Sequence, residues 1–371
     1  MRSLYTILWL CLLLGCSKND DNATQSTTAP PVIPNPPIED PELSVEITQV
    51  GVLPEAVSNN AVVEGFIDDT SYIYSFGGID ETKSSEGIHR RSYRYNTVTS
   101  QVEQIDNLPD TMGKIASGAS RIDNIIYIAG GYYVFDDDSE LTSGKMHRYD
   151  IANNVYLEDA PDIPIPVDDH VQAVWRDQLI YLISGWNNTT NIPNVQIYNP
   201  ISNSWLQGTP VPNDSYQSFG ASGTIVGDTI YYFGGATSNQ GFGIQNQLRI
   251  GTINPDDPTE ISWEIMTPNP TINGYRMGST TVNGLPQWIG GSKNTYNFDG
   301  IAFDGSGGVP TAKRILFIDP IDFQWQEVPA LQIPMDLRGV ASILENVKYT
   351  AGGMMDDQQV TAAIYKLEWP N

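Results

Sequence analysis

The sequence predicts an all-β fold of six repeated four-stranded sheets, because three features recur along it in a fixed order. The first is a short apolar run that ends in two glycines or a close match, which occurs six times. The second is an aromatic residue or isoleucine followed by Asn or Asp, and the third is a large residue further on. A period of 50 to 62 residues is typical of one folding unit copied around or along an axis.

The glycine doublets mark the end of the second strand in each unit, and their first residues lie 53, 54, 50, 56 and 62 positions apart. Glycine at a strand end permits a positive φ and close backbone approach. In the third repeat, serine takes the place of the first glycine. The six doublets are Gly77-Gly78, Gly130-Gly131, Ser184-Gly185, Gly234-Gly235, Gly290-Gly291 and Gly352-Gly353.

The other two landmarks predict a third and a fourth strand joined by a tight turn. In the fourth repeat, Pro255 and Pro258 lengthen this turn before Trp263. In the remaining pairs, the second residue lies seven positions after the first. These pairs are Tyr95 and Val102, Tyr149 and Tyr156, Tyr198 and Trp205, and Ile318 and Trp325. Upstream of five of the doublets, segments rich in small residues predict a first strand at Ser117–Ser120, Val171–Val174, Gly220–Thr224, Gly278–Val282 and Gly339–Ile343.

A four-stranded sheet has two faces and cannot bury both of them alone. Stacking such sheets around an axis buries each face against a neighbour, with small residues on the crowded innermost strand and Trp or Tyr filling the wider gaps outside. We therefore expect a six-bladed β-propeller with four antiparallel strands, a to d, in each blade.

The order of apolar run, Gly-Gly, Tyr-Asp or Tyr-Asn, and Trp resembles the Kelch repeat family of β-propellers, and the resemblance extends from Val45 to Trp369. It implies that the b–c and d–a loops build a ligand-binding face around the mouth of a central channel.

The sixth unit has no residues left for its outer strand, because seven positions beyond Tyr365 the chain has already ended. At the other end, Ile47–Pro54 resembles the segment from Val102 to Pro109. We expect Val45–Leu53 to complete the last blade and close the ring, which also removes an exposed sheet edge.

Residues 1–15 have the form of a lipoprotein signal peptide. Leu13-Leu14-Gly15-Cys16 resembles a bacterial lipobox, which implies diacylglycerol on Cys16 and an anchor in the outer membrane, facing the exterior. The alternative is an ordinary secretory signal with an incidental cysteine. Residues 16–43 are rich in Pro, Ser and Thr and are expected to form an extended tether, followed by the propeller at 44–371.

The net charge of −25 argues against nucleic acid as a partner, because phosphates require a basic surface. The charge provides solubility at a cell exterior or attracts a cationic partner. Cys11 and Cys16 are the two cysteines, so the expected propeller domain contains no disulfide, cysteine nucleophile or cysteine-bound metal.

By the Kelch resemblance, the residue fourteen positions before each doublet lies near the channel mouth. These residues are Val63, Ala116, His170, Gly220, Arg276 and Arg338. Together with neighbouring side chains they provide a candidate ligand-binding set for an anionic or polyhydroxyl ligand: His170, Arg276, Arg338, Asp169, Tyr275 and Trp186. The alternative is that they bond the loops of adjacent blades and stabilise the ring.

The b–c loops contain many aromatic residues, including Tyr132, Trp186, Phe242, Tyr296 and Phe303. Aromatic rings beside Asn and Asp suit stacking on sugars, but they also suit an extracellular protein partner or simple folding of the loops.

The acidic run Asp136, Asp137 and Asp138 is a candidate Ca²⁺ site, although such runs are more often simply solvated. We expect no other cofactor.

No catalytic residue is indicated, because the chain has three histidines without an HExxH pair and lacks a Gly-x-Ser-x-Gly motif. We expect a cell-surface lipoprotein whose propeller binds a glycan or a protein without changing it. The alternative is an enzyme similar to the six-bladed Kelch sialic acid epimerases (mutarotases). That similarity implies proton transfer by His170 or a nearby carboxylate, with Arg276 and Arg338 holding the sugar carboxylate.

Overall fold

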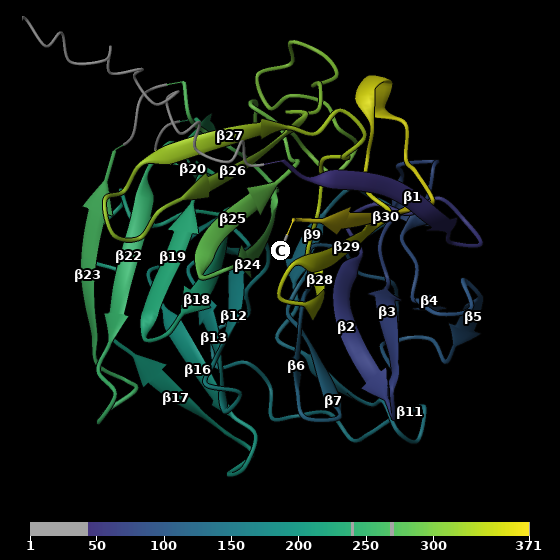
Figure 1. The fold of residues 1–371 in the computed structure, drawn as a ribbon, viewed down its shortest axis with the longest axis horizontal. Coiled ribbons are helices and arrows are strands. Elements are labelled where there is room, and N and C mark those ends of the chain that lie inside the picture. Colours follow the sequence, from purple (N-terminus) through teal and green to yellow (C-terminus); the bar gives the residue numbers. More distant parts are fainter. Residues whose placement is uncertain (1–43, 239–240, 268–270, 371) are drawn as a thin grey trace, which may run out of the picture. The chain divides into compact units, whose positions relative to one another are not determined.

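Six antiparallel sheets of four strands surround a common axis in the computed structural model, which describes residues 44–238, 241–267 and 271–370 (Figure 1). The innermost strands of the six sheets line this axis, as the prediction of a six-bladed all-β propeller requires. The fold prediction is confirmed. The signal peptide, Cys16 and the tether lie outside the described residues.

Blades one to three follow the chain order from the axis outward. Blade one contains β2 (Ala61–Ile67), β3 (Thr70–Phe76), β4 (Ser92–Asn96) and β5 (Val102–Ile105). Blade two contains β6 (Gly118–Ile122), β7 (Ile125–Ala129), β10 (Met146–Asp150) and β11 (Val155–Tyr156). Blade three contains β12 (Val171–Trp175), β13 (Leu179–Ile183), β16 (Val195–Asn199) and β17 (Ser204–Gly208).

Blades four and five repeat the pattern, and blade six takes its outer strand from the other end of the domain. Blade four contains β18 (Ser222–Val226), β19 (Thr229–Phe233), β22 (Leu248–Ile253) and β23 (Ile261–Met266). Blade five contains β24 (Gly278–Val282), β25 (Leu285–Ile289), β26 (Arg314–Ile318) and β27 (Trp325–Pro329). Blade six contains β28 (Ala341–Leu344), β29 (Val347–Ala351), β30 (Ala363–Glu368) and β1 (Glu46–Val52).

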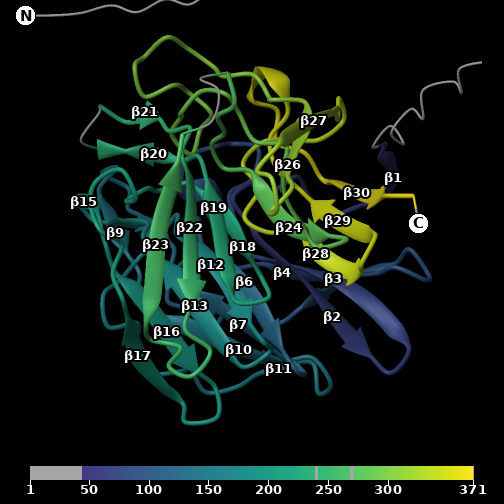
Figure 2. The same cartoon turned by 60° about the vertical axis from the view of Figure 1, so that its left-hand side comes forward.

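Three b–c loops form small hairpins of their own. They are β8 with β9 (Tyr132–Val134 and Glu140–Thr142), β14 with β15 (Trp186–Asn187 and Thr190–Asn191), and β20 with β21 (Ala236–Thr237 and Gly243–Ile244). Figure 2 shows β9, β15, β20 and β21 gathered on one side of the domain. The helical segments include the 3₁₀ turns η1 (Ser85–Gly87) and η3 (Asp356–Gln358), and no described helix is long and apolar enough to cross a membrane.

The predicted ring closure is confirmed. Strand β1 pairs antiparallel with β30, with Ile47 opposite Leu367 and Gln49 opposite Tyr365. Figure 1 shows this purple strand beside the yellow end of the domain. Leu53, directly after β1, is buried in the apolar cluster between blades six and one. Closure therefore covers the edge of β30 and fills a core at the same time.

The spacing between the second and third landmarks follows from the register of the two outer strands. Tyr198 lies directly opposite Trp205, and Ile318 lies opposite Trp325, so that each pair faces the same side of its sheet. The rings of Tyr198 and Trp205 are 5.2 Å apart. These large side chains fill the space that widens between blades away from the axis.

The apolar core is divided into six parts, one between each pair of adjacent blades. In one of them, Tyr231 and Phe233 of blade four pack with Trp288 and Trp325 of blade five. The same arrangement recurs between the other neighbouring blades, and the cluster between blades six and one completes the circle. Each blade thus buries both of its faces, which a single sheet cannot do.

The glycine doublets connect each blade to the next. The backbone N–H of the second doublet residue donates to a carbonyl in the following blade, and Gly353 donates to Val57 of blade one to close the ring at 2.8 Å. The other bonds join Gly78 to Lys114, Gly131 to Val167, Gly185 to Ser218, Gly235 to Gly274, and Gly291 to Pro334. At Ser184 the φ is also positive, and its hydroxyl accepts a bond from the N–H of Ser218.

Candidate functional site

Six residues with left-handed backbone conformations ring the channel just before the innermost strands, one in each blade. Each follows a residue that forms an isolated β-bridge with the b–c loop of the same blade. The six are Asn59, Ala116, Asp169, Gly220, Arg276 and Asp336. Backbone hydrogen bonds join some neighbours directly, such as the N–H of Arg276 to the carbonyl of Gly220 at 2.8 Å.

This ring corrects the fourteen-residue rule in three blades. The rule identifies the ring member at Ala116, Gly220 and Arg276. In blades one, three and six the segment between the ring position and the doublet is longer by four, one and two residues. Val63, His170 and Arg338 therefore lie beyond the ring position, in or beside the innermost strands.

Five polar side chains meet across the axis in what we call the axial ion cluster: Asn59, Asp169, Arg276, Asp336 and Arg338. Arg276 donates from Nη2 to Asp169 Oδ2 at 2.9 Å, and its Nη1 lies 3.6 Å from Asp336 Oδ1. Arg338 contacts Asp169, donates to Asp336 Oδ1 at 3.2 Å and donates from Nε to Asn59 Oδ1 at 3.1 Å. The charged side chains are at most 7% exposed.

The two arginines of this cluster are matched by two carboxylates from other parts of the ring. Buried charges are tolerated when they are paired and hydrogen-bonded. Both arginines are paired here, while Nε and Nη1 of Arg276 are buried without a hydrogen-bond partner among the described residues. The arrangement supports the alternative that these residues bond the loops of different blades. It also means that neither guanidinium is an unpaired cation.

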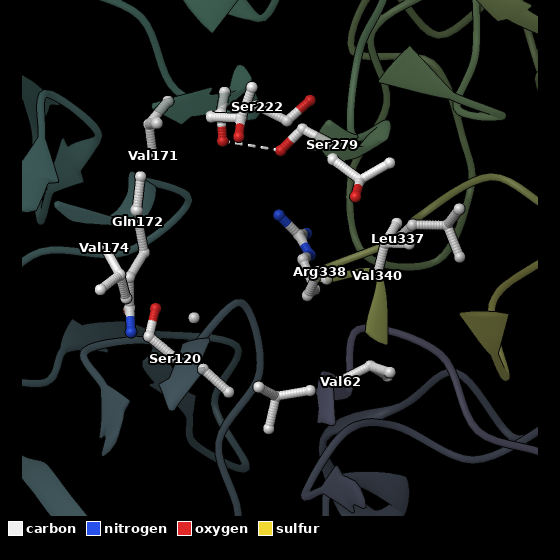
Figure 3. Close-up of a pocket in the computed structure, with 18 of the residues that line it drawn as sticks. Val62, Ser120, Val171, Gln172, Val174, Ser222, Ser279, Leu337, Arg338 and Val340 are labelled. Atoms are coloured by element: carbon white, nitrogen blue, oxygen red, sulfur yellow. Dashed lines mark hydrogen bonds between the residues drawn. The ribbon is translucent and has the colours of Figure 1, made fainter. Parts of the chain in front are cut away.

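Below the axial ion cluster lies the central channel, a cavity of about 350 Å³ lined by the innermost strands. Its wall is rich in Ser, Thr, Gly and small apolar residues, as the sequence of the first strands predicts. Figure 3 shows Arg338 near the middle of the opening, with Ser120, Gln172 and Ser222 among the residues around it.

His170 also lines the channel, where it is buried and lies 3.1 Å from Gln172 Oε1 through its Nε2. Burial lowers the pKa of His170 to about 4, so its imidazole is neutral at physiological pH. A neutral His170 with Nε2–H as donor to Gln172 is the tautomer that this contact favours.

A second cavity of about 210 Å³, which we call the mouth pocket, opens among the b–c loops. Asp169 and Arg276 line both cavities, so their ion pair forms part of the wall between them. The other residues around the mouth pocket are Tyr132, Glu140, Asp168, Trp186, Asn188, Phe219, Phe242, Asn297 and Phe303.

One wall of the mouth pocket is aromatic. Trp186, Phe219, Phe242 and Phe303 come from three different blades and pack against one another, with Trp186 and Phe219 5.2 Å apart and Phe242 and Phe303 4.9 Å apart. Phe219 is buried, whereas the other three rings are half-buried. This arrangement leaves apolar ring surface available to a ligand.

Carboxyl groups face the mouth pocket from blades two and three. Asp168 is 2% exposed, and its backbone pairs with Trp186 through two hydrogen bonds. The hydroxyl of Thr142, at the end of β9, donates to Asp168 Oδ2 at 2.8 Å. Glu140 begins the same strand and lies at the exposed rim.

The environment raises the pKa of both carboxyl groups. Burial raises the pKa of Asp168 to about 7, and the charge of Glu140 adds to this effect against the opposing influence of the Thr142 hydroxyl. Desolvation by the surrounding protein also raises the pKa of Glu140, although its side chain is exposed at the rim. A carboxyl group that titrates near neutral pH is suited to proton transfer or to charge-dependent binding.

The predicted site residues are thus divided between the two cavities. Trp186 lines the mouth pocket, His170 and Arg338 line the channel, and Asp169 and Arg276 line both. Tyr275 lines neither, because its ring packs beneath the aromatic wall, 5.8 Å from Phe219. Ligand binding by these residues stays a prediction.

Phe219 and Asn188 are not marked as site residues by the sequence patterns, and Glu140 is marked only as the last residue of the acidic run at 136–140. The sequence does contain a pattern that marks Phe219: it is the aromatic residue directly before the ring position Gly220, as Tyr275 is directly before Arg276. Asn188 accepts from the N–H of Thr142 at 3.0 Å and so ties blade three to blade two, a contact without a local sequence pattern.

The acidic run at 136–138 lies exposed in the turn between β8 and β9, where Asp137 accepts a hydrogen bond from Ser139. Among the described residues, no group of three or more His, Cys, Asp or Glu side chains is arranged to hold a metal ion. Calcium binding at Asp136, Asp137 and Asp138 remains a prediction.

No family model matches the chain. Among curated proteins it is 27% identical to Kelch-like protein 36 of Mus musculus over 150 residues, which are 40% of this chain and 23% of that protein. It is 26% identical to Kelch-like protein 26 of Danio rerio over 168 residues, or 45% of this chain and 27% of that protein. Kelch-like protein terF of Aspergillus terreus is 26% identical over 51% of this chain and 40% of its own length. The chain thus spans less than half the length of each relative.

Among solved structures, the chain resembles the structure of YjhT with a TM-score of 0.66 and 14% sequence identity. The match covers 86% of this chain and all of the other. At this level of identity the likeness concerns the fold alone. The sequence similarities and the six-bladed architecture together support a Kelch-repeat propeller.

Proposed function

We propose that the protein is a lipid-anchored binding protein of the outer cell surface whose propeller binds a glycan in the mouth pocket. The observation that carries this proposal is the pairing of an aromatic wall with a carboxyl wall in one small cavity. Ring faces suit the C–H faces of sugars, while carboxylate and amide oxygens suit their hydroxyl groups.

The shape of the site favours a glycan over a protein partner. A stable protein interface buries roughly 800 Å² on each partner. The aromatic side chains are instead turned into a cavity of about 210 Å³, where a sugar unit can reach them. Asn188 and Asn297 add amide groups at the rim.

Glycan binding is tested with the chain from residue 16, carrying Cys16→Ser so that it stays soluble. A glycan array identifies ligands, and calorimetry measures their affinity. Phe242→Ala is expected to weaken binding by about tenfold, because stacking on one ring contributes on the order of 1 kcal/mol or more. Phe135→Ala removes an exposed ring outside the pocket and is the matched control, expected to bind like the unchanged protein.

Absence of binding to every glycan would overturn the glycan proposal. Binding that Phe242→Ala leaves intact would move the site away from the mouth pocket. Capture of a specific extracellular protein whose binding depends on Trp186 would favour the protein alternative.

A sugar-acting enzyme is the second candidate, and the raised pKa of Asp168 favours it. A carboxyl group with a pKa of about 7 can give and take a proton near neutral pH. Arg276 and Arg338 contact carboxylates within the protein, so Asp168 is a better candidate for chemistry than they are for holding an anion. An NMR anomer-exchange assay on any bound sugar tests this: Asp168→Asn should abolish exchange while binding persists.

The lipid anchor and its position are tested separately. Fatty-acid labelling in a bacterial host should occur in the full chain and disappear with Cys16→Ser. Protease treatment of intact cells should remove the propeller if it faces the exterior. Labelling without Cys16 dependence would overturn the anchor.

A further inference from the structure

We propose that the mouth pocket selects sugars that carry an ammonium group, through the carboxyl groups of Asp168 and Glu140. This inference rests on the proposed glycan function and specifies its ligand class. The proposed selectivity depends on the charges at the pocket: the arginines are paired with carboxylates, whereas Asp168 and Glu140 have no cationic partner among the described residues.

The positive charges near the pocket are already matched. Arg276 pairs with Asp169 and lies close to Asp336, and Arg338 contacts the same two carboxylates. These two arginines and two aspartates cancel one another. The axial ion cluster therefore presents no surplus cation to a ligand.

Two further carboxyl groups, those of Asp168 and Glu140, line the mouth pocket. Each has at least one oxygen that accepts no hydrogen bond from a described residue. The Thr142 hydroxyl occupies Asp168 Oδ2, while no described residue hydrogen-bonds to Oδ1. Glu140 has no hydrogen bond or ion pair to its carboxyl from any described residue. The remaining titratable group on the pocket wall is the phenol of Tyr132, which burial keeps neutral by raising its pKa.

Asp168 is 2% exposed as a residue and lines the mouth pocket, so a ligand in the pocket can reach Oδ1, which has no hydrogen bond from a described residue. An ammonium donor beside Oδ1 would satisfy it with a charge-assisted hydrogen bond. A sugar carboxylate at the same place would instead meet like charge. The adjacent ring faces of Trp186 and Phe242 also attract a cation.

The aromatic and acidic walls together match the two sides of an amino sugar. The ring carbons stack on the aromatic wall, and the amine on the ring edge reaches the carboxyl wall. N-acetylation removes the positive charge and reduces the three N–H donors of the ammonium group to one, while leaving the sugar ring unchanged. Acetylated and free-amine oligomers of glucosamine are therefore a matched pair of probes.

The experiment measures affinities of four trisaccharide-scale probes by calorimetry: glucosamine trimer, its N-acetylated form, maltotriose and sialyllactose. The protein is the chain from residue 16 with Cys16→Ser. At about pH 6.5, where an alkylamine is largely protonated, the free-amine trimer is expected to bind at least about tenfold more tightly than its N-acetylated form. Sialyllactose is expected to bind most weakly.

Binding should also release protons. Because an ammonium group stabilises the ionised carboxyl forms, the measured heat should vary with the ionisation enthalpy of the buffer. Asp168→Asn and Glu140→Gln should each weaken binding of the free-amine trimer several-fold more than binding of the N-acetylated trimer, so that the ratio of the two affinities falls. Asp138→Asn removes the same charge from the neighbouring turn and is the control, expected to retain the full preference. Circular dichroism confirms that each variant is folded.

The outcomes separate this inference from the proposed function. Equal affinity for the amine and N-acetylated trimers would overturn ammonium selectivity and leave glycan binding in place. No binding of any probe, together with an empty array, would overturn both. An amine preference that survives the Asp168→Asn, Glu140→Gln double variant, or that disappears for the unchanged protein at about 0.5 M salt, would assign it to general attraction by the net charge and overturn the site.

Discussion

Asp169 and Arg338 stand in blades three and six, on opposite sides of the ring, and their side chains are in contact across the axis. Arg276 of blade five donates to the same aspartate at 2.9 Å. Adjacent blades are held by apolar cores and by the glycine doublets. The contact between Asp169 and Arg338 joins blades that share neither, and Asp169 and Arg276 form part of the wall between the central channel and the mouth pocket.

Arg338→Met is expected to lower the free energy of unfolding by about 3 kcal/mol or more, because it leaves the two buried carboxylates of Asp169 and Asp336 with Arg276 as their one remaining cation. Thermal or denaturant unfolding measures the loss. Arg176→Met is the matched control, since Arg176 forms a solvent-screened, exposed pair with Asp228 and its loss should have a much smaller effect. Combining Arg338→Met with Asp169→Asn should recover part of the loss. Similar losses in the two single variants would contradict the structural importance of the axial contact.

Gly130→Ala tests the connection between adjacent blades. Gly130 has a φ of +64°, and a Cβ there would lie 2.1 Å from the carbonyl oxygen of Val167 in the next blade. Gly284 has a φ of +76° and open space around it, so Gly284→Ala incurs backbone strain alone. We expect a loss of about 1 kcal/mol at Gly284 and at least twice that at Gly130. Equal losses, measured by chemical unfolding, would show that the close contact between blades adds nothing.

The doublets and the ring closure could be predicted because each reflects a local backbone requirement. The first doublet residue lies close to a backbone carbonyl of the next blade and has a positive φ, which favours glycine. Ser184 is the exception, and it keeps the positive φ. The outer aromatic residues recur because the c–d hairpin sets them opposite one another. Such requirements leave a periodic pattern in the sequence.

The site residues left a weaker pattern because their positions depend on loop length and on the whole ring. One extra residue displaced His170 from the position that Asp169 occupies. The contact between Asp169 and Arg338 depends on the diameter of the channel, which no local pattern encodes. Glu140 reaches the pocket because β9 pairs with β8, whereas Asp136–Asp138 stay in the turn of the same acidic run.

The stability of the protein should depend on pH through Asp168. Its pKa rises from 3.8 to about 7 on burial, so between these pH values the folded state binds a proton that the unfolded state lacks. The contribution of Asp168 to stability therefore falls as pH rises through this window. Asp168→Asn removes this dependence, because an amide does not titrate.

The free energy of unfolding of the Asp168→Asn variant, minus that of the unchanged protein, should therefore increase between about pH 4 and pH 8. The increase should be on the order of a few kcal/mol. Unfolding curves of both proteins at several pH values measure the difference, in which the effects of other groups cancel. A constant difference across the range would contradict a raised pKa at Asp168.

Removal of β1 tests the closure of the ring. A chain that begins at residue 44 retains the strand that pairs with β30, whereas a chain that begins at residue 54 loses it. The shorter chain exposes the edge of β30 and opens the apolar cluster between blades six and one, which contains Val50 and Leu53. We expect a loss of stability on the order of 3 kcal/mol for burial of this size, which lowers the melting temperature of a domain of this length by about four degrees, and we expect self-association through the open edge. Light scattering and thermal unfolding check both effects.

A synthetic peptide of residues 44–53 should restore the melting temperature of the shorter chain, while a scrambled peptide should not. Unchanged stability and a monomeric state without β1 would mean that the ring holds without its closing strand.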